Sequence, residues 1–197
     1  YGVDRIDVDL NYPRIFVSYS QGLKGVFDSD FNYSKLQLYY RQPLLIGGFG
    51  RLFSTLEIGK TFGAVPLSLM GIIPGNQSYF IIDNTYNLLN YYDFVADQYT
   101  SLHLEHNFNG KLFARVPLLR KLNWREIIGV KAVYGSVSDE NIALNASGQS
   151  YQAPVNGYYE YSAGIGNIFK VMRVDAAWRG SYFNVPDARK FTIRVGF

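Results

Sequence analysis

The sequence predicts an all-β fold, namely an antiparallel transmembrane β-barrel to which this chain contributes eight strands. Three observations support this prediction: apolar and polar residues alternate with period two, the alternating stretches are long, and Tyr and Phe are abundant, with 17 and 14 residues respectively. Period-two alternation is typical of strands with one apolar face. A tilted membrane strand needs about 9 to 11 residues, whereas strands of globular proteins cluster at about 5 or 6.

Eight stretches carry the alternation. They are Arg14 to Gln21, Tyr33 to Gln42, Arg51 to Phe62, Gln98 to Phe108, Arg125 to Tyr134, Tyr158 to Asn167, Lys170 to Tyr182 and Lys190 to Phe197. Tight turns such as 47–50 alternate with long loops such as 63–97 and 136–157, which is typical of short periplasmic turns and long outer loops. We therefore expect residues 1–197 to form one barrel domain with a long outer loop at 63–97.

The alternation leaves open which face of the strands is the inside. In a soluble β-sandwich or barrel the apolar face would form the core, whereas in a membrane barrel it meets lipid and the polar face lines the lumen. The abundant Tyr favours the membrane barrel, because a Tyr ring can lie among acyl chains while its hydroxyl stays hydrated. The predicted lumen-facing residues would form a cross-strand ladder of ion pairs: Glu57, Glu105, Lys131, Glu160, Arg173, Asp175, Arg179 and Arg194.

The composition excludes several classes of protein. The longest weakly polar stretch, 64–74, is about half the roughly 20 residues of a membrane-spanning helix and contains two prolines. The formal charge of +3 is small and scattered, so we expect no nucleic-acid partner. The chain has no Cys, which removes disulfides and thiolate chemistry.

Few residues suggest a metal-binding or catalytic function. In the stretch HLEH, His103 and Glu105 would share a strand face while His106 points away, which is poor geometry for a metal site. Glu57, Glu105 and Glu160 could act as general acid and base, but no Ser-His-Asp order accompanies them, and ion-paired carboxylates explain them better. We expect no metal, no cofactor and no enzymatic activity.

The long loop contains a stretch, 74–94, that is rich in Tyr and Asn and poor in charge. It would be either a plug or partner-binding element that reaches the lumen or the cell surface, or an ordered outer loop that packs on itself. The residues leave both interpretations open.

The end of the chain resembles the signal by which bacterial outer-membrane barrels are recognised for insertion. Phe191, Ile193, Val195 and Phe197 alternate with polar residues and finish on an aromatic side chain. The resemblance implies two partners, the lipid bilayer and the barrel-insertion machinery, and a location in the bacterial outer membrane. Other outer-membrane or periplasmic proteins are further possible partners.

The order of strands and loops resembles the C-terminal half of the barrel of outer-membrane assembly factors and two-partner secretion transporters, the BamA-like superfamily. Three strands precede the long loop and five follow it, which the resemblance equates with strands nine to sixteen of a sixteen-stranded barrel, so that Tyr1 would be a boundary within a longer barrel. Residues 115–135 and 158–179 look most like a Bacteroidota outer-membrane family of unassigned function with a carboxypeptidase-regulatory-like N-terminal domain. The loop 63–97 contains no Arg, however, and so lacks the Val-Arg-Gly-aromatic motif of the superfamily.

These features together predict a noncatalytic outer-membrane β-barrel that serves envelope protein assembly, translocation or scaffolding. Two alternatives remain. The chain could be a complete small eight-stranded barrel that acts as an adhesin or structural anchor, since eight strands enclose an interior that side chains just fill. It could also be a barrel enzyme or a soluble β protein that binds a ligand.

Overall fold

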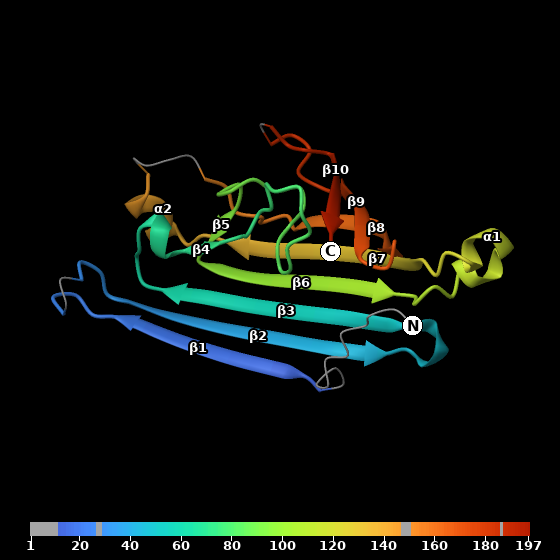
Figure 1. The fold of residues 1–197 in the computed structure, drawn as a ribbon. Helices are drawn as coiled ribbons and strands as arrows, with labels where there is room; N and C mark the ends of the chain where they lie inside the picture. The colour runs from blue at the N-terminus through green and yellow to red at the C-terminus, as the bar shows by residue number, and fades with distance from the viewer. Residues whose placement is uncertain (1–11, 27–28, 147–150, 186) are drawn as a thin grey trace.

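The fold is a strongly curved antiparallel sheet of eight strands, seen in a computed structural model that describes residues 12–26, 29–146, 151–185 and 187–197 (Figure 1). The spatial order of the strands follows the chain: β1 (Arg14–Gly22), β2 (Tyr33–Leu45), β3 (Arg51–Phe62), β6 (Gln98–Asn107), β7 (Arg125–Ser136), β8 (Tyr158–Ile168), β9 (Met172–Arg179) and β10 (Phe191–Gly196). Tyr1, the predicted boundary within a longer barrel, lies outside the described residues.

All eight predicted strands are present, and the alternation of each places apolar and polar side chains on opposite faces. The bounds differ at a few ends: β2 continues to Leu45, and β9 is shorter than the predicted stretch 170–182. The shorter β9 has a local cause, because Lys170 and Tyr182, at the two ends of the predicted stretch, have positive φ values of 71° and 55°, which a strand does not adopt. The predicted antiparallel, mostly β architecture is therefore confirmed.

The sheet is open. Within the described residues, β1 pairs with β2 alone and no strand of the sheet flanks β10 on its other side. Every residue of β1 from Arg14 to Gln21 is exposed, so neither face of this edge strand is covered. These eight strands therefore do not close into a barrel by themselves, and the alternative of a complete small eight-stranded barrel receives no support.

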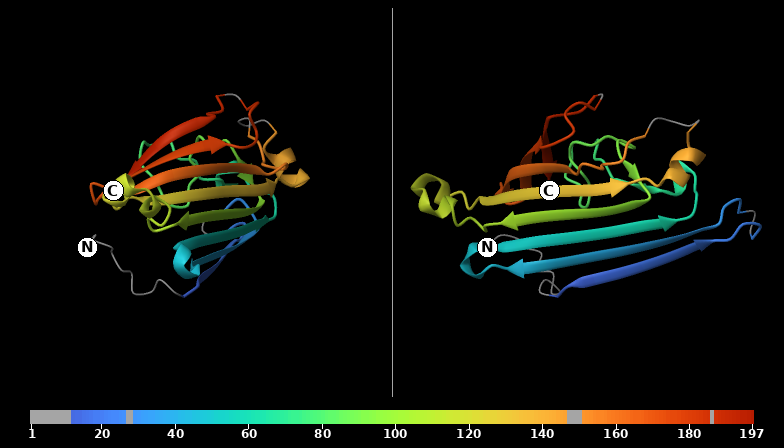
Figure 2. Two further views of the ribbon diagram at one scale, coloured as in Figure 1. Left: turned by 90° about the vertical axis from the view of Figure 1, so that its right-hand side faces the viewer. Right: turned by 180° about the vertical axis from the view of Figure 1, so that it is seen from behind.

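The core lies between the concave face of the sheet and the long connection 63–97, which Figure 2 shows enclosed by the curved strands. This connection contains a small second sheet of β4 (Gly71–Ile72) and β5 (Val95–Ala96). One apolar cluster joins it to β7 and β8: Ile73, Tyr86, Leu89, Phe94, Val133 and Tyr158. A second consists of Val65, Met70 and Val95. The connection therefore packs against the concave face of the sheet and not only on itself, which departs from the interpretation as an outer loop.

Short helices interrupt the other connections. They are the 3₁₀-helices η1 (Gly47–Phe49), η2 (Leu67–Leu69) and η3 (Phe113–Arg115) and the α-helices α1 (Pro117–Arg120) and α2 (Asp139–Leu144). Among the described residues there is no helix with the length and apolar character needed to cross a membrane. The sequence pattern does not predict α1 or α2, because helices of one turn or little more leave no periodic signal.

Helix α2 anchors the start of the long connection. The Oδ2 atom of Asp97, which directly follows β5, accepts hydrogen bonds from the backbone and hydroxyl of Ser138 at 2.7 and 2.5 Å and from Asn141 Nδ2 at 2.8 Å. Asn141 Oδ1 in turn accepts a hydrogen bond from the backbone N–H of Val65 at 2.8 Å. The first residues of the connection are therefore fixed by side chains, which positions the stretch that follows.

Candidate functional site: a segment held against the concave face

Residues 74–94, here called the inner segment, lie against the concave side of β7 to β10 (Figure 2). Two backbone hydrogen bonds shape the segment into a loop whose ends are paired: Asn76 donates to the carbonyl of Tyr86, and Tyr86 donates to the carbonyl of Pro74, each at 2.8 Å. This pairing leaves the peptide groups of Asn87 and Leu88 facing the strands. Buried peptide groups need hydrogen-bond partners, and charged side chains of the sheet provide them.

Glu160 on β8 accepts the N–H groups of the segment. Its Oε1 accepts a hydrogen bond from the backbone of Asn87 at 2.7 Å, and its Oε2 accepts one from the backbone of Leu88 at 3.1 Å. The hydroxyl of Tyr158 donates to the same Oε2 at 3.0 Å. The Glu160 side chain is only 1% exposed, so these donors replace the water that an ionised carboxylate requires.

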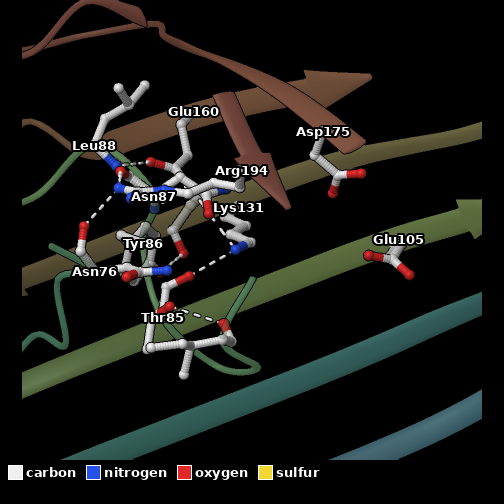
Figure 3. A network of polar contacts seen from close by, with 12 residues as sticks. Asn76, Thr85, Tyr86, Asn87, Leu88, Glu105, Lys131, Glu160, Asp175 and Arg194 are labelled. Atoms are coloured by element: carbon white, nitrogen blue, oxygen red, sulfur yellow. Dashed lines mark hydrogen bonds and ion pairs between the residues drawn. The ribbon is translucent and has the colours of Figure 1, made fainter. Parts of the chain in front are cut away.

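Two arginines bind the carbonyl groups of the same residues. Arg194 Nη2 on β10 donates to the carbonyl oxygens of Asn76 at 2.7 Å and Asn87 at 2.6 Å (Figure 3). Arg179 Nη2 on β9 donates to the carbonyl of Leu88 at 2.6 Å. Asn87 and Leu88 thus each have the N–H group bound by a carboxylate and the C=O group bound by a guanidinium. Hydrogen bonds to charged groups are stronger than those between neutral groups.

A third arginine extends this arrangement. Arg189, from the connection between β9 and β10, donates from Nη2 to the carbonyl oxygens of Asn76 at 3.1 Å and Leu89 at 3.0 Å. Its backbone carbonyl accepts a hydrogen bond from Arg179 Nε at 2.9 Å. We call Glu160, Arg179, Arg189 and Arg194 the backbone clamp.

Lys131 and Tyr86 fix the segment on the β6 and β7 side. Lys131 Nζ donates to the carbonyl of Thr85 at 2.6 Å and lies 4.0 Å from Glu160 Oε1 (Figure 3). The Tyr86 hydroxyl donates to the carbonyl of Ala132 at 2.8 Å and shares a hydrogen bond of 2.7 Å with Ser101 Oγ. Burial raises the pKa of Tyr86 far above its usual value, so this hydroxyl keeps its proton and remains a donor.

Three of the other predicted charged residues, Glu105, Arg173 and Asp175, form a separate group. Arg173 on β9 donates to both oxygens of Glu105 at 3.0 and 2.7 Å, and also to both oxygens of Asp175 at 2.8 and 2.6 Å. Glu57 accepts a hydrogen bond from the Tyr99 hydroxyl at 2.6 Å. A continuous cross-strand ladder of ion pairs is thus not formed by the eight predicted residues. Instead, Glu160, Arg179 and Arg194 bind the peptide groups of the inner segment.

The inner segment also reaches the free edge of β10. The backbone of Ile81 donates to the carbonyl of Val195 at 2.9 Å, and Val195 donates to the carbonyl of Tyr79 at 3.0 Å. The rings of Phe80 and Phe197 lie 6.3 Å apart. Of the residues predicted as an insertion signal, Phe191, Ile193 and Phe197 are exposed and Val195 is partly covered.

The candidate catalytic and metal-binding side chains are dispersed. His103 is half-buried and its ring meets that of Tyr86 edge-on, with ring centres 4.8 Å apart. His106 lies 2.9 Å from the carbonyl of Phe49 and packs on Phe108, with ring centres 4.3 Å apart. The candidate carboxylates, Glu57, Glu105 and Glu160, each have a different partner. In the part of the chain that the structure describes, no three His, Asp or Glu side chains are grouped as metal ligands.

Two functional features were not identified from sequence. Arg189 lies in a connection outside the alternating strands, and the backbone of 76–89 has no side-chain signature at all. One signal was available: the loop 63–97 carries no cation although arginines crowd the last two strands. A loop without cations, whose charged residues are Asp83, Asp93 and Asp97, can approach buried arginines and offer them its carbonyl groups.

The geometry defines a class of protein: a curved antiparallel sheet with an apolar convex face and a charged concave face that holds an internal segment of the same chain. The chain belongs to a family of unknown function, DUF5686, whose C-terminal domain it matches over residues 1–165. Searches of curated proteins and of solved structures found no match.

Proposed function

We propose that this domain forms part of the wall of a bacterial outer-membrane β-barrel without catalytic activity, and that the barrel serves envelope protein assembly, translocation or scaffolding. One observation carries the proposal: the sheet has its polarity reversed relative to a soluble protein. Glu160 and Arg194 on the concave face are 1% and 2% exposed, whereas Val130 and Ile193 on the convex face are 48% and 54% exposed. A convex face of this kind suits acyl chains.

The aromatic side chains of the convex face support the same proposal. Tyr134, Tyr159 and Tyr161 are all about half exposed, and the ring of Tyr161 stacks on Trp178 with centres 5.7 Å apart. Tyr and Trp concentrate where a barrel meets the membrane interfaces. Phe191, Ile193, Val195 and Phe197 would then face lipid and serve as the signal for the insertion machinery.

The unpaired edges of the sheet support a larger barrel. Both β1 and the remainder of β10 present backbone groups that in a bilayer must be paired within protein. We propose that further strands connect these edges, as in the sixteen-stranded arrangement of BamA-like proteins. The inner segment would then occupy part of the lumen, which favours assembly or scaffolding over an open pore.

The experiment compares the same substitution on the two faces of the sheet. The protein that contains this domain is folded from urea into phosphatidylcholine vesicles, and its free energy of unfolding is measured. Val130→Arg, on the convex face of β7, should destabilise it by about 2–4 kcal/mol, the cost of Arg near the bilayer midplane. Ser18→Arg, on the polar face of β1, is the matched control and should have little effect.

Two outcomes would overturn the proposal. One is equal destabilisation by Val130→Arg and Ser18→Arg, because lipid contact would then not distinguish the faces. The other is refolding of the wild-type protein into a soluble monomer in buffer without lipid or detergent, since an exposed apolar convex face does not permit that.

A further inference from the structure

The connection between β6 and β7, residues 108–124, is much longer than the other connections at the same end of the sheet. The other two connections at this end are tight: residues 46–50 join β2 to β3, and residues 169–171 join β8 to β9. The three connections are in contact. Asn167 Nδ2 donates to the carbonyl of Asn123 at 2.8 Å, and Lys111 Nζ lies 5.2 Å from the ring centre of Phe49. Connecting two neighbouring antiparallel strands needs only a few residues, so the extra length of residues 108–124 needs another explanation.

This connection is strongly cationic. From residue 111 to residue 125 the chain has no Asp or Glu, and its basic residues are Lys111, Arg115, Arg120, Lys121 and Arg125. Arg115, Arg120 and Lys121 are exposed, and Lys170 of the neighbouring turn is exposed beside them. Such a local excess of positive charge contrasts with the net charge of only +3 for the whole chain.

The same surface exposes large apolar side chains. Leu118 on α1 is 77% exposed, and Leu112, Val116 and Leu122 are each nearly half exposed. From the adjacent turn, Phe169 is 85% exposed. Exposed apolar residues interspersed with Lys and Arg are typical of segments that lie in the interface of a membrane.

A hollow lies among these groups. It has a volume of about 700 Å³ and is lined by residues of both connections, including Arg120, Lys121, Trp124 and Lys170. Phe113 donates its backbone N–H to Glu126 Oε1, which ties η3 to the first residues of β7. The hollow therefore has an anchored wall, cationic side chains around it and a Trp at its border.

We propose that residues 111–125 and 169–171, here called the basic collar, bind the phosphate headgroups of anionic phospholipids in the leaflet at this end of the barrel. The inference rests on the proposed membrane location. Lys and Arg of the collar neutralise the phosphates, while Leu118 and Phe169 enter the acyl region. Charge complementarity selects this occupant, since a zwitterionic surface offers no net attraction to the cations.

The test measures binding of phosphatidylglycerol to the protein that contains this domain, folded in detergent, by native mass spectrometry during a lipid titration. The variant carries Arg115→Gln, Arg120→Gln and Lys121→Gln. Each cation close to an anionic surface contributes about a fivefold gain in affinity, so the triple variant should bind on the order of 100-fold more weakly at low salt. Phosphatidylcholine should bind equally weakly to both proteins.

A control of equal charge uses Lys24→Gln, Lys60→Gln and Lys190→Gln, three exposed lysines near the opposite end of the strands. This variant should retain phosphatidylglycerol binding. Equal losses in the two variants, an unchanged affinity in the collar variant, or a wild type that does not prefer phosphatidylglycerol would each overturn the inference. An acidic protein that binds the collar while phosphatidylglycerol does not would also overturn it.

Failure of this inference is separable from failure of the proposed function. Insertion into phosphatidylcholine vesicles needs no anionic lipid and reports on the barrel alone. A wild type that inserts there without preferring phosphatidylglycerol refutes only the basic collar, whereas a wild type that does not insert refutes the membrane location.

Discussion

The two halves of the sheet, the covered half with β8 to β10 and the uncovered half with β1, differ in how the polar side chains of the concave face are compensated. Strands β8 to β10 carry charged side chains that are almost fully buried, such as Glu160 and Arg194, and the backbone of the inner segment provides their partners. Strand β1 carries Arg14, Phe16, Ser18 and Ser20 on the corresponding face, and all four are exposed. The comparison teaches that charged side chains are buried in this protein where a folded-back backbone can compensate them, whereas the polar face of β1, which includes Arg14, stays exposed where no such backbone is present.

Replacement of Glu160 by Ala should have the largest effect on the covered half. The change removes the acceptor of two backbone N–H groups and leaves buried cations uncompensated, which typically costs about 3–5 kcal/mol. Urea unfolding of the detergent-folded protein measures the loss. Glu140→Ala, an exposed glutamate on α2, is the matched control and should stay near the wild type. A Glu160→Ala variant as stable as that control would show that the backbone clamp has no energetic role.

Arg194→Met should loosen the inner segment with a smaller overall cost. The hydrogen bonds from Arg194 to Asn76 and Asn87 are lost, but Arg189 still donates to the carbonyl of Asn76, so the uncompensated loss should be that of one charged hydrogen bond, about 1.5–3 kcal/mol. The segment contains Tyr, Phe and Leu, so chymotrypsin cleavage within 74–94 should become at least about tenfold faster. The exposed Arg51 provides the control Arg51→Met. Unchanged cleavage in the Arg194→Met variant would mean that Arg194 does not restrain the segment.

Tyr39→Phe tests the border between the halves. Asn84 Nδ2 donates to the Tyr39 hydroxyl at 3.2 Å, which joins the inner segment to β2 at a partly exposed position. A single neutral hydrogen bond contributes about 0.5–1.5 kcal/mol, so the free energy of unfolding should fall by about that amount. Tyr134→Phe, at an exposed position on the convex face of β7, allows for the loss of a hydroxyl as such. A loss as large as that of Glu160→Ala would place the main attachment of the segment at β2.

Ser20→Ala should have the smallest effect, because the side chain lies exposed on the uncovered β1. Substitutions of this kind usually change stability by less than about 0.5 kcal/mol. The same unfolding experiment measures it. A loss above 1.5 kcal/mol, larger than any ordinary surface effect, would show that something covers the concave face of β1 and would contradict the contrast between the halves.

Much of the sheet was predictable because strand alternation is a local property. Ile128, Val130 and Tyr134 share the exposed face of β7 as the period-two pattern requires, and Lys131 lies on the opposite face. The predicted strands follow one another in space because antiparallel neighbours usually pair. Closure of the sheet into a barrel could not be deduced in this way, since it depends on which strands pair with the outer edges of β1 and β10.

The site was only partly predictable. The sequence indicated that Glu160, Arg179 and Arg194 share a face, and the structure places all three around the inner segment. Their partners are peptide groups of Asn87 and Leu88, which any residues there could provide, so side-chain chemistry could not reveal them. Arg189 was missed for a related reason, because its position in a connection has no strand period to assign it a face.

By itself the sequence determined the β class, the strand order and the two faces of each strand, because backbone pleating translates residue spacing directly into direction. Only the tertiary structure decided that the long connection 63–97 folds back against the concave face, and that its backbone rather than neighbouring side chains compensates the buried charges. The physical reason is that every buried peptide group needs a partner wherever the chain passes. The partners can be far apart in the chain, as Leu88 and Arg179 are, and a local sequence pattern therefore does not reveal them.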